Sequence, residues 1–167
     1  DSSPSRGLGD VYKRQLNVLI AGSTGYIGVQ LIKLLIKHKN INIKYLCGNP
    51  SVGKKISSYD TSLKSKKLPR ITKYNKKYLS YVDIIFTALP NGEAQLISKD
   101  LLKKNTLIDL AADFRLNKAS DYLKWYKQKH KALSNIKNSI YALPEITGKL
   151  VKKFSIIGCP GCYPTSI

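Results

Sequence analysis

Two cysteines stand three residues apart in the segment GCPGCYPT, residues 158–165. Prolines and glycines surround Cys159 and Cys162, so the backbone is expected to turn sharply between an apolar strand at 154–157 and a following helix. Cys162 would begin that helix, where free amide groups stabilise a thiolate, the nucleophilic form of cysteine. These residue types therefore predict a nucleophilic Cys162, although the C-x-x-C spacing is also that of a redox pair or of half a metal site.

A glycine-rich segment, GSTGYIG, has the residue types of a phosphate-binding turn. It follows the apolar run LNVLIA and opens an amphipathic stretch, so the order is strand, turn and helix. Glycine lets the backbone approach a pyrophosphate, and the first amides of the helix attract the anion. The G-x-x-G-x-x-G spacing is a variant of the dinucleotide fingerprint. We expect a dinucleotide to bind to the whole turn, with phosphate contacts from the serine and threonine hydroxyls: Gly22, Ser23, Thr24, Gly25, Tyr26, Ile27 and Gly28.

The segment CGNPSVGKK, residues 47–55, indicates which dinucleotide binds. NAD-selective sites usually carry Asp or Glu about 20 residues after the glycines, where the carboxylate binds the ribose hydroxyls. No acidic residue occurs between residues 46 and 58, whereas Ser51, Lys54 and Lys55 are suited to a ribose 2′-phosphate. The predicted cofactor is therefore NADP(H), bound in part by Ser51.

Strands and helices must alternate to position these two segments. Helical periodicity predicts one helix over 26–38 and another around 94–101. The first of these helices is expected to bury four residues: Ile27, Leu31, Leu34 and Leu35. Short apolar, β-branched runs predict four further segments as strands: 16–21, 41–47, 82–89 and 107–110. This alternation predicts an α/β fold, a Rossmann-like doubly wound parallel sheet.

Three stretches are less regular. Residues 51–77 are dense in lysine and predict loop with a short strand, and residues 120–130 predict a short helix capped by Ser or Asp. Residues 1–15, which end in DVYKRQ, show no apolar periodicity, and we interpret them as a non-native leader. The predicted NADP-binding domain therefore covers residues 16–150.

Composition limits the possible partners. The sequence is 43% hydrophobic and 23% charged and has no apolar run long enough for a membrane span, so we expect a soluble protein without a membrane partner. Three unevenly spaced cysteines and the lack of a secretory signal favour the cytoplasm. The net charge of +19 comes from dispersed lysines, and only four arginines occur. Arginine is the residue that reads guanine edges, so nucleic acid is not the expected partner.

Five segments, in this order, resemble N-acetyl-γ-glutamyl-phosphate reductases, enzymes of arginine biosynthesis. Many dehydrogenases share the first segment, while the combination of ADFRL with PGCYPT is the most specific. The resemblance runs from residue 16 to the last residue and is carried by GSTGYIG (22–28), ALPNGEAQ (88–95), LIDLAADFRL (107–116), YALPEI (141–146) and PGCYPT (160–165).

The resemblance implies an activity. Cys162 would attack the γ-acyl phosphate, phosphate would leave, and hydride from NADPH would convert the resulting thioester to the semialdehyde through a hemithioacetal. It also implies a homo-oligomer, with residues 151–167 as the start of a truncated catalytic α+β domain, so this chain alone is expected to be inactive. The glycine turn and Ser51 would hold NADP. Four residues would lie near the nicotinamide: Leu89, Pro90, Asn91 and Gly92.

Two residues depart from the family pattern. Cys159 replaces a frequent Asn, and Asn91 replaces a frequent His. The first departure allows the hypothesis that Cys159 and Cys162 form a disulfide that switches activity off. Asp113 and Arg115 either support the site or brace the turn after their strand, and bracing is the interpretation we favour.

Other functions fit these residues less well. A thioredoxin-like motif does not require the upstream glycines, and a zinc site would need two further ligands, so no metal is expected. An extended short-chain dehydrogenase needs a lysine four residues after a tyrosine, which none of the eleven tyrosines has. Aspartate-semialdehyde dehydrogenases use the same thioester chemistry but lack PGCYPT. An aminoadipate-phosphate reductase and a lysine-rich Rossmann module that binds nucleic acid remain alternatives.

Overall fold

The computed structural model describes residues 15–166, in which a parallel sheet is the central element. Except for Gln15, the predicted leader lies outside the described residues. Seven strands pair in the order β3-β2-β1-β4-β5-β7-β6, and every pair is parallel. The strands are β1 (Leu16–Ala21), β2 (Ile41–Cys47), β3 (Ile71–Thr72), β4 (Ile84–Thr87), β5 (Thr106–Asp109), β6 (Ser139–Tyr141) and β7 (Ile156–Gly158).

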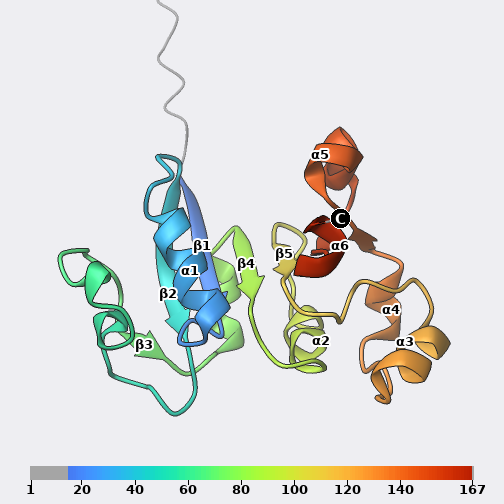
Figure 1. Ribbon diagram of the computed structural model, residues 1–167, viewed down its shortest axis with the longest axis horizontal. Coiled ribbons are helices and arrows are strands. Elements are labelled where there is room, and N and C mark those ends of the chain that lie inside the picture. Colours follow the sequence, from blue (N-terminus) through green and yellow to red (C-terminus); the bar gives the residue numbers. More distant parts are fainter. Residues whose placement is uncertain (1–14, 167) are drawn as a thin grey trace, which may run out of the picture.

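Helices pack against this sheet (Figure 1), and hydrophobic side chains are buried on both of its faces. One buried cluster packs α1 against β1 and β2, and a second packs α2 against β1, β4 and β5. This arrangement confirms the predicted α/β, doubly wound fold. The helices are α1 (Tyr26–Leu35), α2 (Glu93–Ser98), α3 (Ala119–Tyr126), α4 (Leu133–Ile136), α5 (Pro144–Thr147) and α6 (Cys162–Ser166), with 3₁₀ turns at 56–58, 61–63, 76–81 and 148–153.

The buried face of α1 differs from the predicted one. Ile27 and Leu34 are 54% and 66% exposed, so the prediction that they face the core was wrong. The inward residues are Gly28, Val29, Ile32 and Leu35. The close approach of Gly28 to the preceding turn fixes this rotation, because no other residue type fits at that crossing.

Two further details were not predicted correctly. The helix α3 begins after Lys118 and has no side-chain cap, so the expected Ser or Asp cap was wrong. The strand β6 was missed because it has three residues and no apolar alternation. It pairs with β7, which itself lies next to β5.

The strand order determines where a ligand can bind. Moving from β1, the chain continues to β2 and β3 on one side and to β4 and β5 on the other. Ligands of doubly wound sheets bind at the carboxyl ends of the strands where the order reverses. In this sheet the reversal lies between β1 and β4.

Candidate active site

Four loops meet at the carboxyl edge of the sheet. They follow β1 (residues 22–28), β4 (88–92), β5 (110–115) and β7 (159–162). Their strands are consecutive neighbours in the sheet, so the glycine turn and the cysteine turn lie three strand spacings, or roughly 14 Å, apart. The fold therefore brings together the two segments that the sequence singled out.

The first and third glycines of the turn are so close to other backbone atoms that no side chain fits at either position. Gly22 has φ +83°, and a Cβ on it would lie 2.1 Å from the Ala88 carbonyl oxygen. A Cβ on Gly28 would lie 2.2 Å from the Gly22 carbonyl oxygen. Gly25 differs, because a Cβ there would meet only the Gly22 oxygen at 3.6 Å, an ordinary contact. Packing within the chain therefore explains two glycines and leaves Gly25 unexplained.

Gly25 is also the residue at which α1 begins. It is exposed, its φ of −73° is open to any residue type, and no side chain caps the helix. The first amides of an uncapped helix are available to an anion. A bare, exposed backbone at this point is what close approach of a phosphate requires.

The hydroxyl residues of the turn take different positions. Ser23 is fully buried, and its hydroxyl donates to the Cys47 carbonyl oxygen at 3.1 Å. Its hydroxyl therefore joins the turn to the end of β2. Thr24 lies against Gly48, on which a Cβ would be 3.1 Å from the Thr24 methyl carbon. Tyr26 and Ile27 are exposed.

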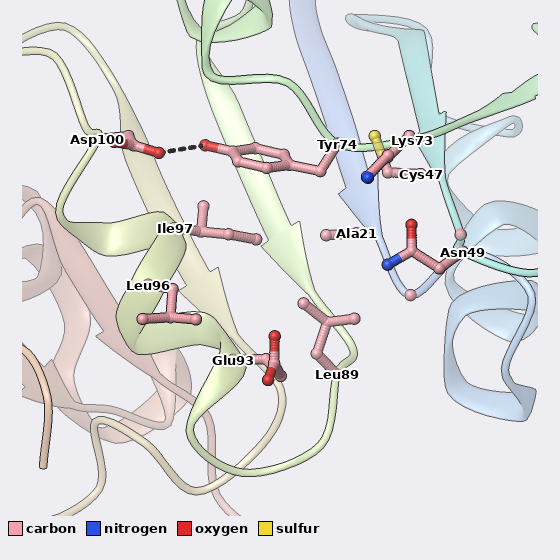
Figure 2. Close-up of a pocket in the computed structure, with 12 residues that line it drawn as sticks. Ala21, Cys47, Asn49, Lys73, Tyr74, Leu89, Glu93, Leu96, Ile97 and Asp100 are labelled. Carbon is pink, nitrogen blue, oxygen red and sulfur yellow. Dashed lines mark hydrogen bonds between the residues drawn. The ribbon is translucent and has the colours of Figure 1, made fainter.

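A pocket of about 260 Å³ opens beside the glycine turn, between the end of β2 and α2. Figure 2 shows Tyr74 extending toward Asp100, with Leu89 and Glu93 on the α2 side and Asn49 opposite. The Tyr74 hydroxyl donates to Asp100 Oδ2 at 3.2 Å. The predicted site residues Gly22 and Leu89 line this pocket, together with Ala21, Cys47, Gly48, Asn49, Lys73, Tyr74, Glu93, Leu96, Ile97 and Asp100.

The loop after β2 lies close to this pocket and presents no carboxylate. Ser51 is buried, and its hydroxyl is hydrogen-bonded to the Tyr59 hydroxyl. Lys54 and Lys55 are exposed. Asn49 stands two residues after β2, where NAD-selective sites carry an acid, and it lines the pocket.

The loop 88–92 contains the residues expected near the nicotinamide. Pro90 and Asn91 are exposed, while Leu89 is half-buried. Gly92 is buried with φ +94° and donates its N–H to Asp113 Oδ1 at 2.7 Å. The outer residues of this loop are therefore accessible, and its last residue is anchored.

The cysteine turn packs tightly on the loop after β5. A Cβ on Gly158 would lie 2.4 Å from the Phe114 carbonyl oxygen. Arg115 Nε donates to the Cys159 carbonyl oxygen at 2.8 Å, so this side chain joins the loop after β5 to the cysteine turn. Cys162 is exposed and is the first residue of α6.

The two thiols of the turn differ in environment. Both are free, but Cys159 is partly buried and Cys162 is exposed. Burial, with the Asp109 carboxylate adding to it, raises the pKa of the Cys159 thiol to about 11. Little Cys159 thiolate forms near neutral pH, so Cys162 is the better placed nucleophile.

Sequence reasoning missed a buried polar group beneath these loops. His130 is buried, accepts a hydrogen bond from the Ala132 N–H at Nδ1 and is 3.0 Å from the Asp113 carbonyl oxygen at Nε2. Nδ1 must therefore be unprotonated, and Nε2 is the donor. Burial lowers the pKa of His130, which agrees with a neutral ring. Only its position in a lysine-rich stretch was visible in the sequence, and that gave no signal of burial.

Asp109 was also missed, and it gives a pH-dependent prediction. Its carboxyl is fully buried, and burial raises its pKa to about 6 from an ordinary value of 3.8. Because the folded pKa exceeds the unfolded one, its stabilising contribution is complete below about pH 4 and is lost as the pH rises through 6. Between pH 4 and pH 7, the free energy of unfolding measured with urea should fall by about 2–3 kcal/mol more for the wild type than for Asp109→Asn.

His130 is present in both proteins, so its own titration cancels in this difference. Glu145→Gln, which changes an exposed carboxylate, is the control and should follow the wild type. Parallel pH curves for the wild type and Asp109→Asn would contradict the prediction.

Neither a metal centre nor a membrane span is found in the part of the chain that the structure describes. No group of three or more His, Cys, Asp or Glu residues within 15–166 is arranged to hold a metal ion. Over the same residues, no helix has the length and apolar character needed to cross a membrane.

The chain is similar to proteins of a known family. Residues 17–154 match the family described as the NAD-binding domain of semialdehyde dehydrogenases. N-acetyl-γ-glutamyl-phosphate reductases from Ehrlichia ruminantium (strain Gardel) and Psychrobacter sp. (strain PRwf-1) are each 40% identical to it, over 91% and 90% of this chain. A probable chloroplastic enzyme of the same name from Arabidopsis thaliana is 34% identical over 93% of this chain. The chain covers 44%, 44% and 39% of these relatives, so it spans less than half of their length.

Two solved structures share the fold. Aspartate semialdehyde dehydrogenase with NADP from Candida albicans superposes with a TM-score of 0.58 at 18% identity, over 89% of this chain and 43% of that one. Aspartate semialdehyde dehydrogenase II from Vibrio cholerae gives a TM-score of 0.59 at 20% identity, over 90% and 39%. Both comparisons agree with the Rossmann-like sheet described above.

Proposed function

The chain belongs to the semialdehyde dehydrogenase family, whose NAD-binding domain it matches, and from this premise we propose that it is the NADP(H)-binding part of an N-acetyl-γ-glutamyl-phosphate reductase. The reaction would reduce the acyl phosphate of N-acetyl-glutamyl-5-phosphate to the 5-semialdehyde. The relatives that carry this name support the choice of substrate over aspartyl or aminoadipyl phosphates.

One observation carries the proposal. An exposed cysteine at the start of a helix stands on the same sheet edge as an uncapped glycine turn. Two strands separate the turn from the cysteine, and loops 88–92 and 110–115 fill the interval. A dinucleotide with its pyrophosphate on the turn can extend its nicotinamide toward Cys162 across this interval.

Cys162 and Arg115 would have different roles in the reaction. The exposed thiol of Cys162 would attack the acyl carbon, so that the sulfur–carbon bond forms as the bond to phosphate breaks. Bound NADPH would supply the hydride that reduces the resulting thioester. The Arg115 bond to the Cys159 carbonyl would hold the thiol in place during both steps. Collapse of the hemithioacetal would return the thiol and release the aldehyde.

The choice of NADP over NAD is part of the proposal. Asn49 occupies the pocket position at which an acid would bind free ribose hydroxyls, and Lys54 and Lys55 lie exposed a few residues later. A 2′-phosphate beside the loop after β2 would meet its lysines, and that loop itself has no carboxylate. The Ser51 hydroxyl, which now bonds Tyr59, would have to turn outward to join them.

The proposal also includes a domain organisation and a description of the whole enzyme. Residues 16–150 would form the cofactor domain, and residues 151–167 would begin a catalytic domain completed by further polypeptide. The whole enzyme would be a cytoplasmic homo-oligomer. These assignments rest on the resemblance and on the length of the relatives.

The test is dinucleotide binding by the Gly25→Ala variant. A methyl group at Gly25 meets nothing closer than 3.6 Å in the chain, so the melting temperature should stay within about 2 °C of the wild type. The same methyl group stands where the pyrophosphate must approach, so the Kd for NADPH, measured by fluorescence titration, should rise at least about tenfold.

Wild-type protein that binds NADPH no better than the Gly25→Ala variant would contradict the proposal. Salt-dependent retention of the chain on DNA without NADPH binding would favour the nucleic-acid alternative.

A further inference from the structure

Two buried aspartates connect the loops of the proposed site. Neither Asp109 nor Asp113 has any solvent-exposed surface. Asp109 accepts hydrogen bonds from Thr87 Oγ1 at 2.8 Å and from the Asp113 N–H at 3.0 Å. Its main-chain carbonyl accepts from the Cys159 N–H at 2.8 Å. Asp109 thus joins β4, the loop after β5 and the cysteine turn.

Asp113 extends this unit to the loop after β4. Its Oδ1 accepts from the Gly92 N–H at 2.7 Å, and its carboxylate also accepts from the main chain and side chain of Gln95 at 3.3 and 3.0 Å. The Tyr122 hydroxyl donates to the same carboxylate at 2.6 Å. Hydrogen bonds to a carboxylate are roughly twice as strong as those between neutral groups. One side chain therefore fixes both the last residue of loop 88–92 and the first turn of α2.

The geometry at Gly92 makes this anchor specific. Gly92 has φ +94°, a conformation that few residues adopt, and it is the residue at which the loop becomes helix. Its N–H points inward at Asp113, so the residues just before it are turned outward, and Pro90 and Asn91 are exposed. This bond fixes the inner end of the loop, while the bond from the Ala88 N–H to the Ala21 carbonyl oxygen at 2.8 Å fixes its start.

We propose that Asp113 is a positioning residue that holds loop 88–92 in the conformation that receives the nicotinamide end of a bound dinucleotide. The inference rests on the proposed function, which places this loop beside the nicotinamide. Asp113 is buried beneath the loop and acts through the Gly92 backbone, so it does not itself contact the cofactor. The loop needs such an anchor because its outer residues are exposed.

Two ligands separate positioning from general stability. NADPH carries the nicotinamide, and 2′-phospho-ADP-ribose is the same molecule without it. Asp113→Ala removes both carboxylate oxygens, including the Oδ1 that accepts from the Gly92 N–H. The Kd for NADPH, from fluorescence or calorimetric titration, should rise about tenfold in this variant. The Kd for 2′-phospho-ADP-ribose, which reaches only the glycine turn and the β2 loop, should stay within about twofold.

Tyr122→Phe is the matched control. It removes another bond to the same carboxylate, at 2.6 Å, while the Gly92 bond remains. Its ratio of the two Kd values should equal that of the wild type even where its melting temperature falls. If Asp113 had a purely structural role, its replacement would raise the Kd values of both ligands by the same factor, and that result overturns the inference.

The remaining outcomes are also decisive. An Asp113→Ala variant that binds both ligands like the wild type overturns the inference and leaves the proposed function standing. Wild-type protein that binds neither ligand overturns the proposed function and this inference together. Should Asp113→Ala not fold, hydrogen exchange of the Gly92 amide in the wild type decides, since protection of at least about 100-fold supports the anchor and its lack refutes it.

Discussion

Replacing Cys162 with serine should lower turnover by at least about a thousandfold, because a serine hydroxyl at neutral pH is a far weaker nucleophile than a thiolate. The assay runs the reaction in reverse, with N-acetyl-glutamate semialdehyde, phosphate and NADP. Since the chain spans less than half of its relatives, it is joined for this purpose to the remaining part of the Ehrlichia ruminantium enzyme. Binding of NADP should be unchanged, since Cys162 lies beyond the glycine turn.

Cys159→Ser is the matched control, because it changes a cysteine three residues away in the same turn. Burial raises the pKa of the Cys159 thiol to about 11, so we expect little thiolate from it, and the variant should keep at least half of the activity. Thiol–disulfide exchange that needs both cysteines, without any dehydrogenase turnover, would show that the C-x-x-C segment is a redox pair. Equal sensitivity of Cys159→Ser and wild type to mild oxidant would dispose of a disulfide switch.

Replacing Gly28 with alanine should lower the free energy of unfolding by about 3 kcal/mol or more. The new methyl group would lie 2.2 Å from the Gly22 carbonyl oxygen, a backbone atom that cannot move without shifting the whole turn away from β1. Gly22→Ala should be at least as damaging, since it adds a strained φ of +83° to a contact of 2.1 Å with Ala88. Urea unfolding measures both effects.

The middle glycine of the same motif supplies the comparison. The methyl group of Gly25→Ala makes only an ordinary van der Waals contact, so the free energy of unfolding of this variant should lie within about 0.5 kcal/mol of the wild-type value. Three chemically identical substitutions within seven residues thus separate the glycines that the fold needs from the one that a ligand needs. Equal destabilisation by all three would show that the turn is only a structural element.

The sheet was predictable from sequence where its strands are long and apolar. β1 and β2 were placed at their observed bounds. β1 is a nearly continuous apolar run, as buried parallel strands are, whereas β2 was marked by apolar residues that alternate with Asn42 and Lys44. The buried face of α1 was not predictable, since Ile27 and Leu34 fit a helical stripe as well as Val29 and Ile32 do. The contact between Gly28 in α1 and Gly22 in the preceding turn determines which face of the helix is buried, and these two residues belong to different elements.

The motifs of the candidate site could be predicted from the sequence, but the long-range hydrogen bonds that hold its loops could not. The residues that carry chemistry, such as Cys162 and Gly25, stand in segments whose local pattern is informative. Asp109 and His130 were missed, and Asp113 was singled out without its partner Gly92. The bonds that join these residues to other loops span 17 to 50 residues in sequence, and no local pattern marks those pairs. Ser23 shows the reverse, since its hydroxyl was expected to meet phosphate and instead bonds the Cys47 carbonyl.

The position of β7 between β5 and β6 also sets an order for folding during synthesis. By residue 109 the strands β1 to β5 all have their partners, so this part of the sheet can assemble while the chain is still growing. β6 pairs only with β7 among the described strands, and β7 follows it in the sequence. β6 must therefore wait, unpaired, until residues 156–158 arrive and enter between it and β5. The cysteine turn comes directly after β7, so the proposed nucleophile Cys162 is the last of the four described loops' features to form, and it forms in the step that completes the described sheet.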